Sequence, residues 1–330
     1  MVEDFGLPSP GWDCSTLSGV PVSSSVAAAV SPTRQALRRA RKDRSARLGA
    51  VLVVLLVLVA AAAPLLVKLS GQDPYTYHLD LLDPARGNAP KGALGGVSSD
   101  HWFGVEPLTG RDLFSIVVLG LRTSLTIAIV VTLVTSVVGT LIGISAAYFG
   151  GWYDAVASRV FDFLFGFPQL VFMIALGIIV PAGFPRWLLL ILVLSVFGWA
   201  SLARLIRNQA RSLVAREFVE AARSVGSSGW HVITRELLPN LLGPVLVIAT
   251  LAIPGYIGAE AALSFLGVGV PPPTPSLGRS ISDSIAWVYT GADPWFLFFP
   301  GVALFVAVLG FTLLGDGVRD AFDVRLRRTT

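Results

Sequence analysis

The sequence predicts an all-α polytopic membrane protein with six transmembrane helices, and three observations lead to this fold class. Hydrophobic residues make up 54% of the 330 positions and charged residues only 14%, whereas soluble domains carry roughly 25% charged residues. The mean hydropathy is +0.71. The apolar residues also gather in long uninterrupted runs instead of alternating with polar ones. This pattern favours membrane-spanning helices over barrel strands.

Six runs are long enough to cross a bilayer, because about 20 apolar residues span about 30 Å of hydrocarbon. The runs cover Leu48–Val67, Thr123–Phe149, Phe163–Pro181, Trp187–Ala203, Leu241–Ala259 and Trp295–Gly315. The first run ends in VAAAAP, which resembles the cleavage site of a signal peptide. However, the 47 residues before it exceed the basic region of a signal peptide. Residues 48–69 are therefore expected to remain as the first transmembrane helix.

The distribution of Lys and Arg predicts which side of the membrane each segment occupies, because cytoplasmic segments are enriched in both. The segments on one side of the predicted membrane carry 18 of the 25 Lys and Arg residues, and the segments on the opposite side carry six. The remaining residue, Arg122, lies at a boundary and is not counted. The basic set comprises tails 1–47 and 319–330, loop 204–240 and Arg159, and the external set includes segments 70–112 and 267–294. Both termini are therefore expected in the cytoplasm. The N-terminal tail is rich in Ser, Pro and Gly before its basic end, which predicts that it is mostly disordered.

The loop at 204–240 contains EFVEAARSVGSSGWHVITRELLPN, which predicts two helices joined by a glycine turn. The first, 215–226, is amphipathic. Its apolar face comprises Phe218, Val219, Ala222 and Val225. Gly226 can adopt the left-handed conformation that ends helices, and Ser227 or Ser228 can cap the next helix. Pro239 marks a bend or a fresh helix start. On physical grounds this element lies flat on lipid or inserts into the groove of a soluble partner.

The same segment resembles the EAA loop of ABC-importer permeases. The matching residues are Glu220, Ala221, Ala222, Gly226, Leu238 and Pro239. Residues 146–168, 260–279 and 294–323 are similar to one branch, the C-type permease of dipeptide and oligopeptide importers. The resemblance runs from about His101 to Arg325. HWFGVEPLTGRD, at its start, departs from the usual pattern of that branch at several positions.

This resemblance implies a type I ABC-importer permease fold, with the transmembrane core over 113–318, in a bacterial inner membrane. The implied partners are a second homologous permease, two cytoplasmic ATPase domains, an external substrate-binding protein and membrane lipid, with no nucleic acid. The residues implied in coupling to the ATPase are Phe218, Val219, Glu220, Ala221, Ala222, Arg223, Gly226, Leu238 and Pro239. The implied cargo is a di- or oligopeptide, and nickel or another small solute is the alternative.

The chain is expected to bind no ATP of its own, because a phosphate-binding loop needs Gly-Lys followed by Ser or Thr. Its three lysines, Lys42, Lys68 and Lys91, are followed by Asp, Leu and Gly. The sequence also has no His-Glu-x-x-His metal motif and no Gly-x-Ser-x-Gly nucleophile motif. A non-catalytic subunit is therefore expected, without cofactor or metal, with ATP and magnesium on partner subunits.

Two residues are candidates for translocation or gating, Pro254 within the fifth run and Glu260 directly after it. Glu260 is an ionisable group in an apolar helix, which often marks a transport pathway. It follows a potential kink at Pro254, and near the external end of its helix it could instead reach water. Gly139 and Gly143 form a face of small residues that favours close helix packing. A secondary transporter that works alone and a membrane scaffold are the remaining alternatives.

Overall fold

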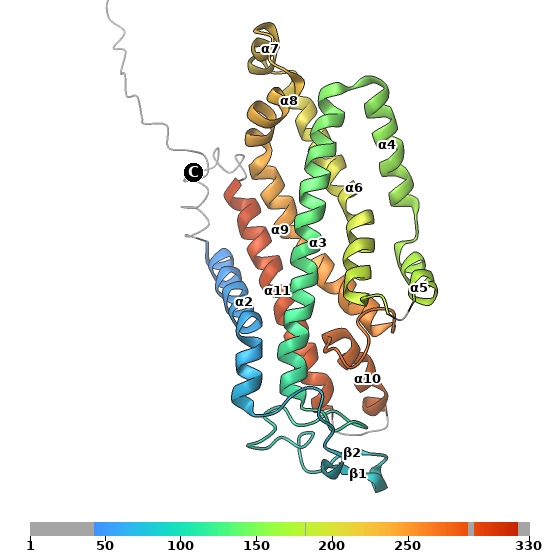
Figure 1. The fold of residues 1–330 in the computed structure, drawn as a ribbon. Coiled ribbons are helices and arrows are strands. Elements are labelled where there is room, and N and C mark those ends of the chain that lie inside the picture. The colour runs from blue at the N-terminus through green and yellow to red at the C-terminus, as the bar shows by residue number, and fades with distance from the viewer. Residues whose placement is uncertain (1–42, 182, 290–293, 323–330) are drawn as a thin grey trace, which may run out of the picture.

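The structure is a computed structural model that describes residues 43–181, 183–289 and 294–322. Its helices form an elongated bundle, with the small strands β1 and β2 at one end and α7 at the other (Figure 1). We call these the strand end and the α7 end. Most of the N-terminal tail, residues 1–42, lies outside the described residues, as do residues 323–330 of the C-terminal tail. The predictions for the tails therefore stay predictions.

Within the described residues, five helical stretches are long and apolar enough to cross a membrane. They are α2 (Arg44–Ser70), α3 (Leu113–Phe149), α6 (Arg186–Val214), the stretch Gly229–Phe265 and α11 (Trp295–Phe322). The fourth stretch consists of α8 (Gly229–His231), a π-helix (Val232–Leu237) and α9 (Leu238–Phe265). Each contains one of the predicted apolar runs, and the all-α class is confirmed.

The third predicted span, Phe163–Pro181, is not one straight helix. It is divided between α4 (Gly151–Gly166) and α5 (Gln169–Ile179), which meet at an angle of 75°. Pro168 causes the break, because its ring disfavours helical backbone in the preceding residue. Phe167 is accordingly extended, with φ −84° and ψ 129°. The number of spans reaches six when this bent pair is counted as one.

The central helix α3 packs closely along α6 through the predicted small-residue face. A β-carbon at Gly139 would lie 2.8 Å from the carbonyl oxygen of Trp199. One at Gly143 would lie 2.6 Å from the carbonyl oxygen of Ala203. Such separations are shorter than van der Waals contact, so only glycine permits this approach of the two backbones. The prediction of close packing at these glycines is confirmed.

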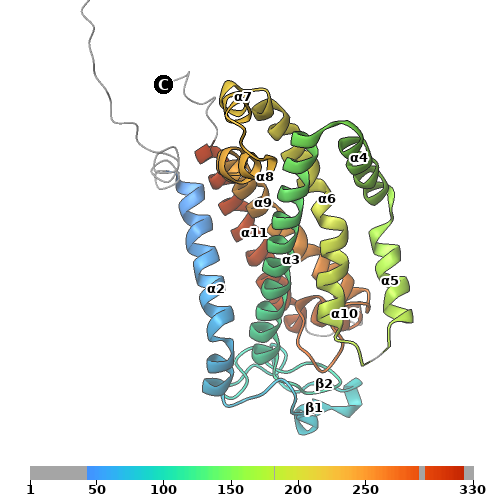
Figure 2. The ribbon, with the colours of Figure 1, turned by 45° about the horizontal axis from the view of Figure 1, so that its top comes forward.

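Helix α2 lies on the flank of the bundle beside α11 and α3 (Figure 2). Its inner face packs into the cluster around Phe311 of α11 through Leu56 and Ala60. Its outer face keeps large apolar side chains exposed, including Val51 and Leu58. An exposed apolar face of this length suits contact with lipid.

The strand end is built from two segments that the sequence places far apart. Segment 71–112 contains two short 3₁₀ helices, η2 (Leu79–Leu81) and η3 (Pro84–Arg86), and a two-residue antiparallel ladder. The ladder pairs β1 (Leu82–Asp83) with β2 (Ala89–Pro90). The second segment holds the short helix α10 (Leu277–Tyr289).

Candidate functional site

At the α7 end the predicted helix–glycine–helix element is present. Helix α7 (Glu217–Ser224) is slightly shorter than the predicted 215–226. Gly226 has a φ of 84°, the left-handed conformation expected of a residue that ends a helix, and its N–H donates to the carbonyl of Arg223 at 2.9 Å. Ser228 Oγ accepts from the backbone N–H of His231 at 3.3 Å and so caps α8. The predicted glycine stop and serine cap are confirmed.

Val219 seats α7 on the bundle. Its side chain is fully buried in a cluster that includes Ile144 of α3, Ile206 of α6 and Leu237 of the π-helix. Ala222 packs against the same cluster. The element is therefore packed against three membrane helices at once.

The rest of the predicted apolar face is arranged differently. Phe218 is 37% exposed and Val225 is 86% exposed. Val225 does not continue the buried face because α7 ends at Ser224 and the chain turns at Gly226. Trp230, which no sequence pattern singled out, is 63% exposed. The α7 end thus presents Phe218, Val225 and Trp230 as exposed apolar side chains, which we call the apolar tip.

The other predicted coupling residues lie on or beside the surface of this element. Glu220, Ala221, Arg223, Gly226 and Pro239 are exposed, whereas Ala222 and Leu238 are half-buried. The guanidinium carbon of Arg223 lies 4.6 Å from the ring centroid of Tyr148, at the end of α3. This cation–π contact ties the polar face of α7 to the end of the longest described helix.

Pro239 lies in the first turn of α9, directly after the π-helix. Proline lacks a backbone N–H and its ring displaces the carbonyl four residues earlier, which here belongs to Arg235. A widened turn accommodates both effects. The predicted irregularity at Pro239 is therefore a π-helical turn, without a break in the helix.

A cluster of charges fastens α4 to α6 near the α7 end. Asp154 is 7% exposed and accepts from Nη2 of Arg207 at 2.7 Å, with further contacts from Arg207 Nε and Arg211 Nη2. Asp162, farther along α4, pairs with Arg204. The sequence pointed to these arginines only as markers of the basic side. In the folded chain they hold the first half of the bent pair in place.

Glu260 lies at the opposite end of α9, fully buried. Its Oε2 accepts from Ser124 Oγ of α3 at 2.5 Å. Its Oε1 accepts from Ser264 at 2.8 Å and from Ser276, which precedes α10, at 3.2 Å. The alternative that Glu260 reaches water is wrong, because three serines enclose the carboxyl group. Glu260 therefore joins α9 to α3 and to the α10 segment, by which we mean Ser276 and the neighbouring residues before α10 together with α10 itself. Pro254 lies half-buried within α9.

Comparison with known proteins assigns the chain to a family. Residues 139–328 match the family described as "Binding-protein-dependent transport system inner membrane component". The chain belongs to this family. Residues 31–90 of the permease also match the N-terminal transmembrane domain of oligopeptide transport permease C.

Full-length relatives of the permease carry similar descriptions. It is 35% identical over 301 residues to the dipeptide transport system permease protein DppC of Alkalihalophilus pseudofirmus, covering 91% of this chain and 92% of the relative. It is 34% identical over 296 residues to the oligopeptide transport system permease protein OppC of Bacillus subtilis, covering 89% and 90%. The glutathione transport system permease protein GsiD of Escherichia coli O1:K1 is 34% identical over 296 residues, covering 90% and 91%. The chain is thus a non-catalytic, multi-pass inner-membrane subunit of an ABC importer.

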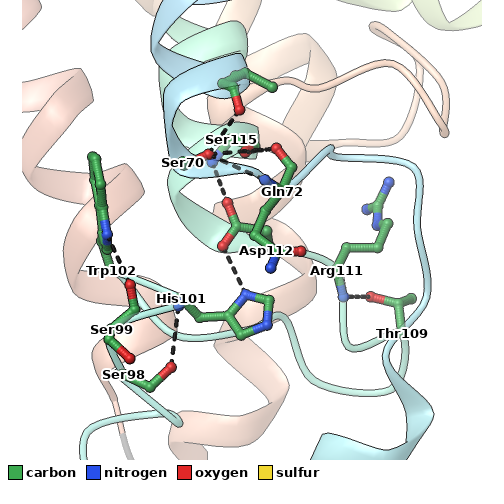
Figure 3. Close-up of polar contacts among 11 residues, drawn as sticks. Ser70, Gln72, Ser98, Ser99, His101, Trp102, Thr109, Arg111, Asp112 and Ser115 are labelled. Atoms are coloured by element: carbon green, nitrogen blue, oxygen red, sulfur yellow. Dashed lines mark hydrogen bonds and ion pairs between the residues drawn. The ribbon is translucent and has the colours of Figure 1, made fainter.

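At the strand end of the permease, the stretch that departs from the usual pattern of its branch forms buried polar pairs. Figure 3 shows the pair between His101 and Asp112. His101 Nδ1 lies 2.9 Å from Asp112 Oδ1, and Asp112 Oδ2 accepts from the N–H of Ser115 at 2.8 Å, which caps α3. Arg111 Nε donates to Glu106 at 2.8 Å, and Arg111 Nη1 donates to the Pro273 carbonyl at 3.4 Å. The pairs fix segment 71–112 on the start of α3 and join it to the α10 segment.

Proposed function

We propose that this permease forms half of an inward pathway for di- or oligopeptides and receives its driving force at the α7 end. The peptide assignment follows the relatives, whose descriptions name dipeptide, oligopeptide and glutathione transport. The coupling assignment depends on one observation above all. The apolar tip of Phe218, Val225 and Trp230 is exposed on an element whose base, Val219, is fully buried.

A cleft in a cytoplasmic ATPase domain is the proposed receptor for the apolar tip. ATP and magnesium belong to that partner, and its nucleotide-driven closure moves α7. Because Val219 connects α7 to α3, α6 and the π-helix, these elements move with it. The π-helix continues into α9, so the displacement runs along α9 toward the strand end. There Glu260 couples α9 to α3 and to the α10 segment.

The proposed orientation places the α7 end and both termini in the cytoplasm and the strand end outside. The excess of Lys and Arg in the segments of the α7 end supports it. A second homologous permease completes the pathway, and an external binding protein delivers the peptide to the strand end. Membership in a binding-protein-dependent transport family supports the external binding protein as a partner.

The coupling proposal is tested by changing the apolar tip and retrieving the ATPase. Phe218→Asp and Val225→Asp each place a charge where an apolar groove is expected, and ATPase recovered with the purified permease should fall at least about tenfold. Leu79→Asp is the matched control, because Leu79 is 64% exposed at the strand end. Undiminished ATPase recovery with both tip variants would contradict docking at this surface.

The transport proposal is tested with the assembled importer in vesicles. Uptake of a radiolabelled dipeptide should require ATP and the external binding protein. Uptake by this chain alone, driven by an ion gradient, would favour a secondary transporter. Unchanged peptide uptake in cells lacking the chain would favour a scaffold, and transport of nickel without transport of peptide would favour the metal importer.

A further inference from the structure

A cleft of about 520 Å³ opens at the strand end between α3, the start of α6 and the loop before α10. Its walls include Arg122, Thr123 and Thr126 of α3, Trp187 of α6, Thr274, and Tyr75 of segment 71–112. The volume lies within the range of about 300–1,000 Å³ that is typical of small-ligand sites. The cleft is distinct from the apolar tip and from the enclosure of Glu260.

Arg122 is the only charged residue in α3, a helix of 37 residues. It is exposed, and within the part of the chain that the structure describes no carboxylate forms an ion pair with its guanidinium. Arg111, Arg207 and Arg279, in contrast, each have an acidic partner. An arginine on a membrane helix costs least where its long side chain reaches the membrane boundary, so Arg122 is expected close to water.

The level of the cleft along the bundle follows from the packing of α3 against α6. Gly139 meets Trp199 and Gly143 meets Ala203, so the two helices run in the same direction. Trp187 lies one residue after the start of α6 at the strand end. Tryptophan is enriched at the boundary between lipid and water. The cleft therefore lies at the membrane boundary, where loops outside the bilayer, carrying Tyr75 and Thr274, form part of its wall.

The geometry points to this cleft as a subsite at the outer mouth of the pathway, where Arg122 binds the C-terminal carboxylate of the incoming peptide. The inference rests on the proposed function and its orientation. A guanidinium holds a carboxylate through two parallel hydrogen bonds. The hydroxyls of Thr123 and Thr126 donate to the backbone carbonyls of Leu119 and Arg122 at 3.0 and 2.7 Å, so their lone pairs remain to accept from a peptide N–H. Trp187 offers an apolar surface to a side chain.

The chemistry of the site suits cargo of varied sequence. Every linear peptide has one terminal carboxylate, whatever its side chains. A single arginine with neighbouring hydroxyl groups recognises this common part. The apolar remainder of the wall, including Leu119 and Ile127, imposes no charge requirement on the side chains. The subsite would therefore orient peptides without selecting among them.

The test uses the complete importer, with its binding protein and ATPases, in vesicles. Initial uptake rates are measured below saturation for alanyl-alanine and for its C-terminal amide, which lacks the carboxylate. Arg122→Gln should lower uptake of the free acid about tenfold or more, because a hydrogen-bonded charge is lost, and should change uptake of the amide less than about twofold. Arg122→Lys should recover part of the free-acid rate, since it keeps the charge without the two-pronged geometry.

Three controls isolate the effect of Arg122. Arg86→Gln removes a charge at the same end of the molecule, from a side chain that is 80% exposed, and should leave both rates unchanged. The binding protein is identical in every sample, so its own preference cancels when each variant is divided by the unaltered importer. ATP hydrolysis without peptide should be the same in all variants.

Four results would overturn the inference. Equal losses for acid and amide would show that Arg122 does not read the carboxylate. Failure of Arg122→Gln to co-purify with its permease partner would assign Arg122 to the interface between subunits. A loss that depends on the anionic lipid content of the vesicles, and not on the substrate, would assign it to a phosphate headgroup. Absence of peptide uptake by the unaltered importer would remove the proposed function itself, and the subsite with it.

Discussion

Replacement of Glu260 by alanine is expected to destabilise the permease strongly. Its carboxyl group is fully buried and accepts from Ser124, Ser264 and Ser276 at 2.5, 2.8 and 3.2 Å. Glu260→Ala removes three hydrogen bonds of about 1 kcal/mol each and leaves a small cavity, so that roughly 3–5 kcal/mol of stability is lost. Glu260→Gln keeps the shape, and serine hydroxyls can donate or accept. We expect it to cost less than about half as much.

The assay is thermal unfolding of the purified permease in detergent, followed by the fluorescence of its eight tryptophans. At about 2–4 °C per kcal/mol, Glu260→Ala should lower the unfolding midpoint by roughly 6–20 °C. Glu236→Ala is the control, since this half-buried glutamate lies near the α7 end, and its midpoint should stay within about 2 °C of the unaltered protein. A midpoint for Glu260→Ala as high as that of the control would refute the role of Glu260 as a structural junction.

Three further substitutions, two of them with a matched control, test the α7 end and the attachment of α4 beside it. In Gly226→Pro, the proline ring requires a negative φ where the chain has +84°. Recovery of the ATPase with the purified variant should therefore fall at least about tenfold, while membrane insertion is unchanged. Recovery equal to that of the unaltered chain would count against the glycine turn as part of the docking element. Val219→Ala removes two buried methyl groups and should lower the free energy of unfolding by about 1–3 kcal/mol. The control Val225→Ala, at an 86% exposed position, should leave the unfolding midpoint unchanged. Equal midpoints for the two variants would show that Val219 does not anchor α7. Asp154→Asn should destabilise the permease by about 2–4 kcal/mol, because Arg207 loses a buried charged partner. The control Asp162→Asn breaks an exposed ion pair and should destabilise the permease by less than about 1 kcal/mol. Similar losses of stability for both variants would mean that α4 is not fastened at Asp154.

The sequence by itself determined the helical class, the positions of the long spans and the element at the α7 end. These features depend on short-range patterns. Apolar runs of sufficient length reveal membrane helices, and the spacing of Gly226 and Ser228 reveals a helix end and the next helix start. Gly139 and Gly143 indicated close packing because four residues separate them on one helix face.

Only the tertiary structure decided which side chains meet across the bundle. Ser124 and Glu260 are 136 positions apart, and Asp154 and Arg211 are 57 apart, so no local spacing predicts either contact. Periodicity grouped Val219 with Val225, yet one is buried and the other exposed, because burial depends on which neighbours pack against a short helix and where the chain turns away. The 75° bend in the third span has a local cause in Pro168, but its angle depends on the helices around it. The cleft around Arg122 likewise exists only because segments distant in sequence fold against the start of α6.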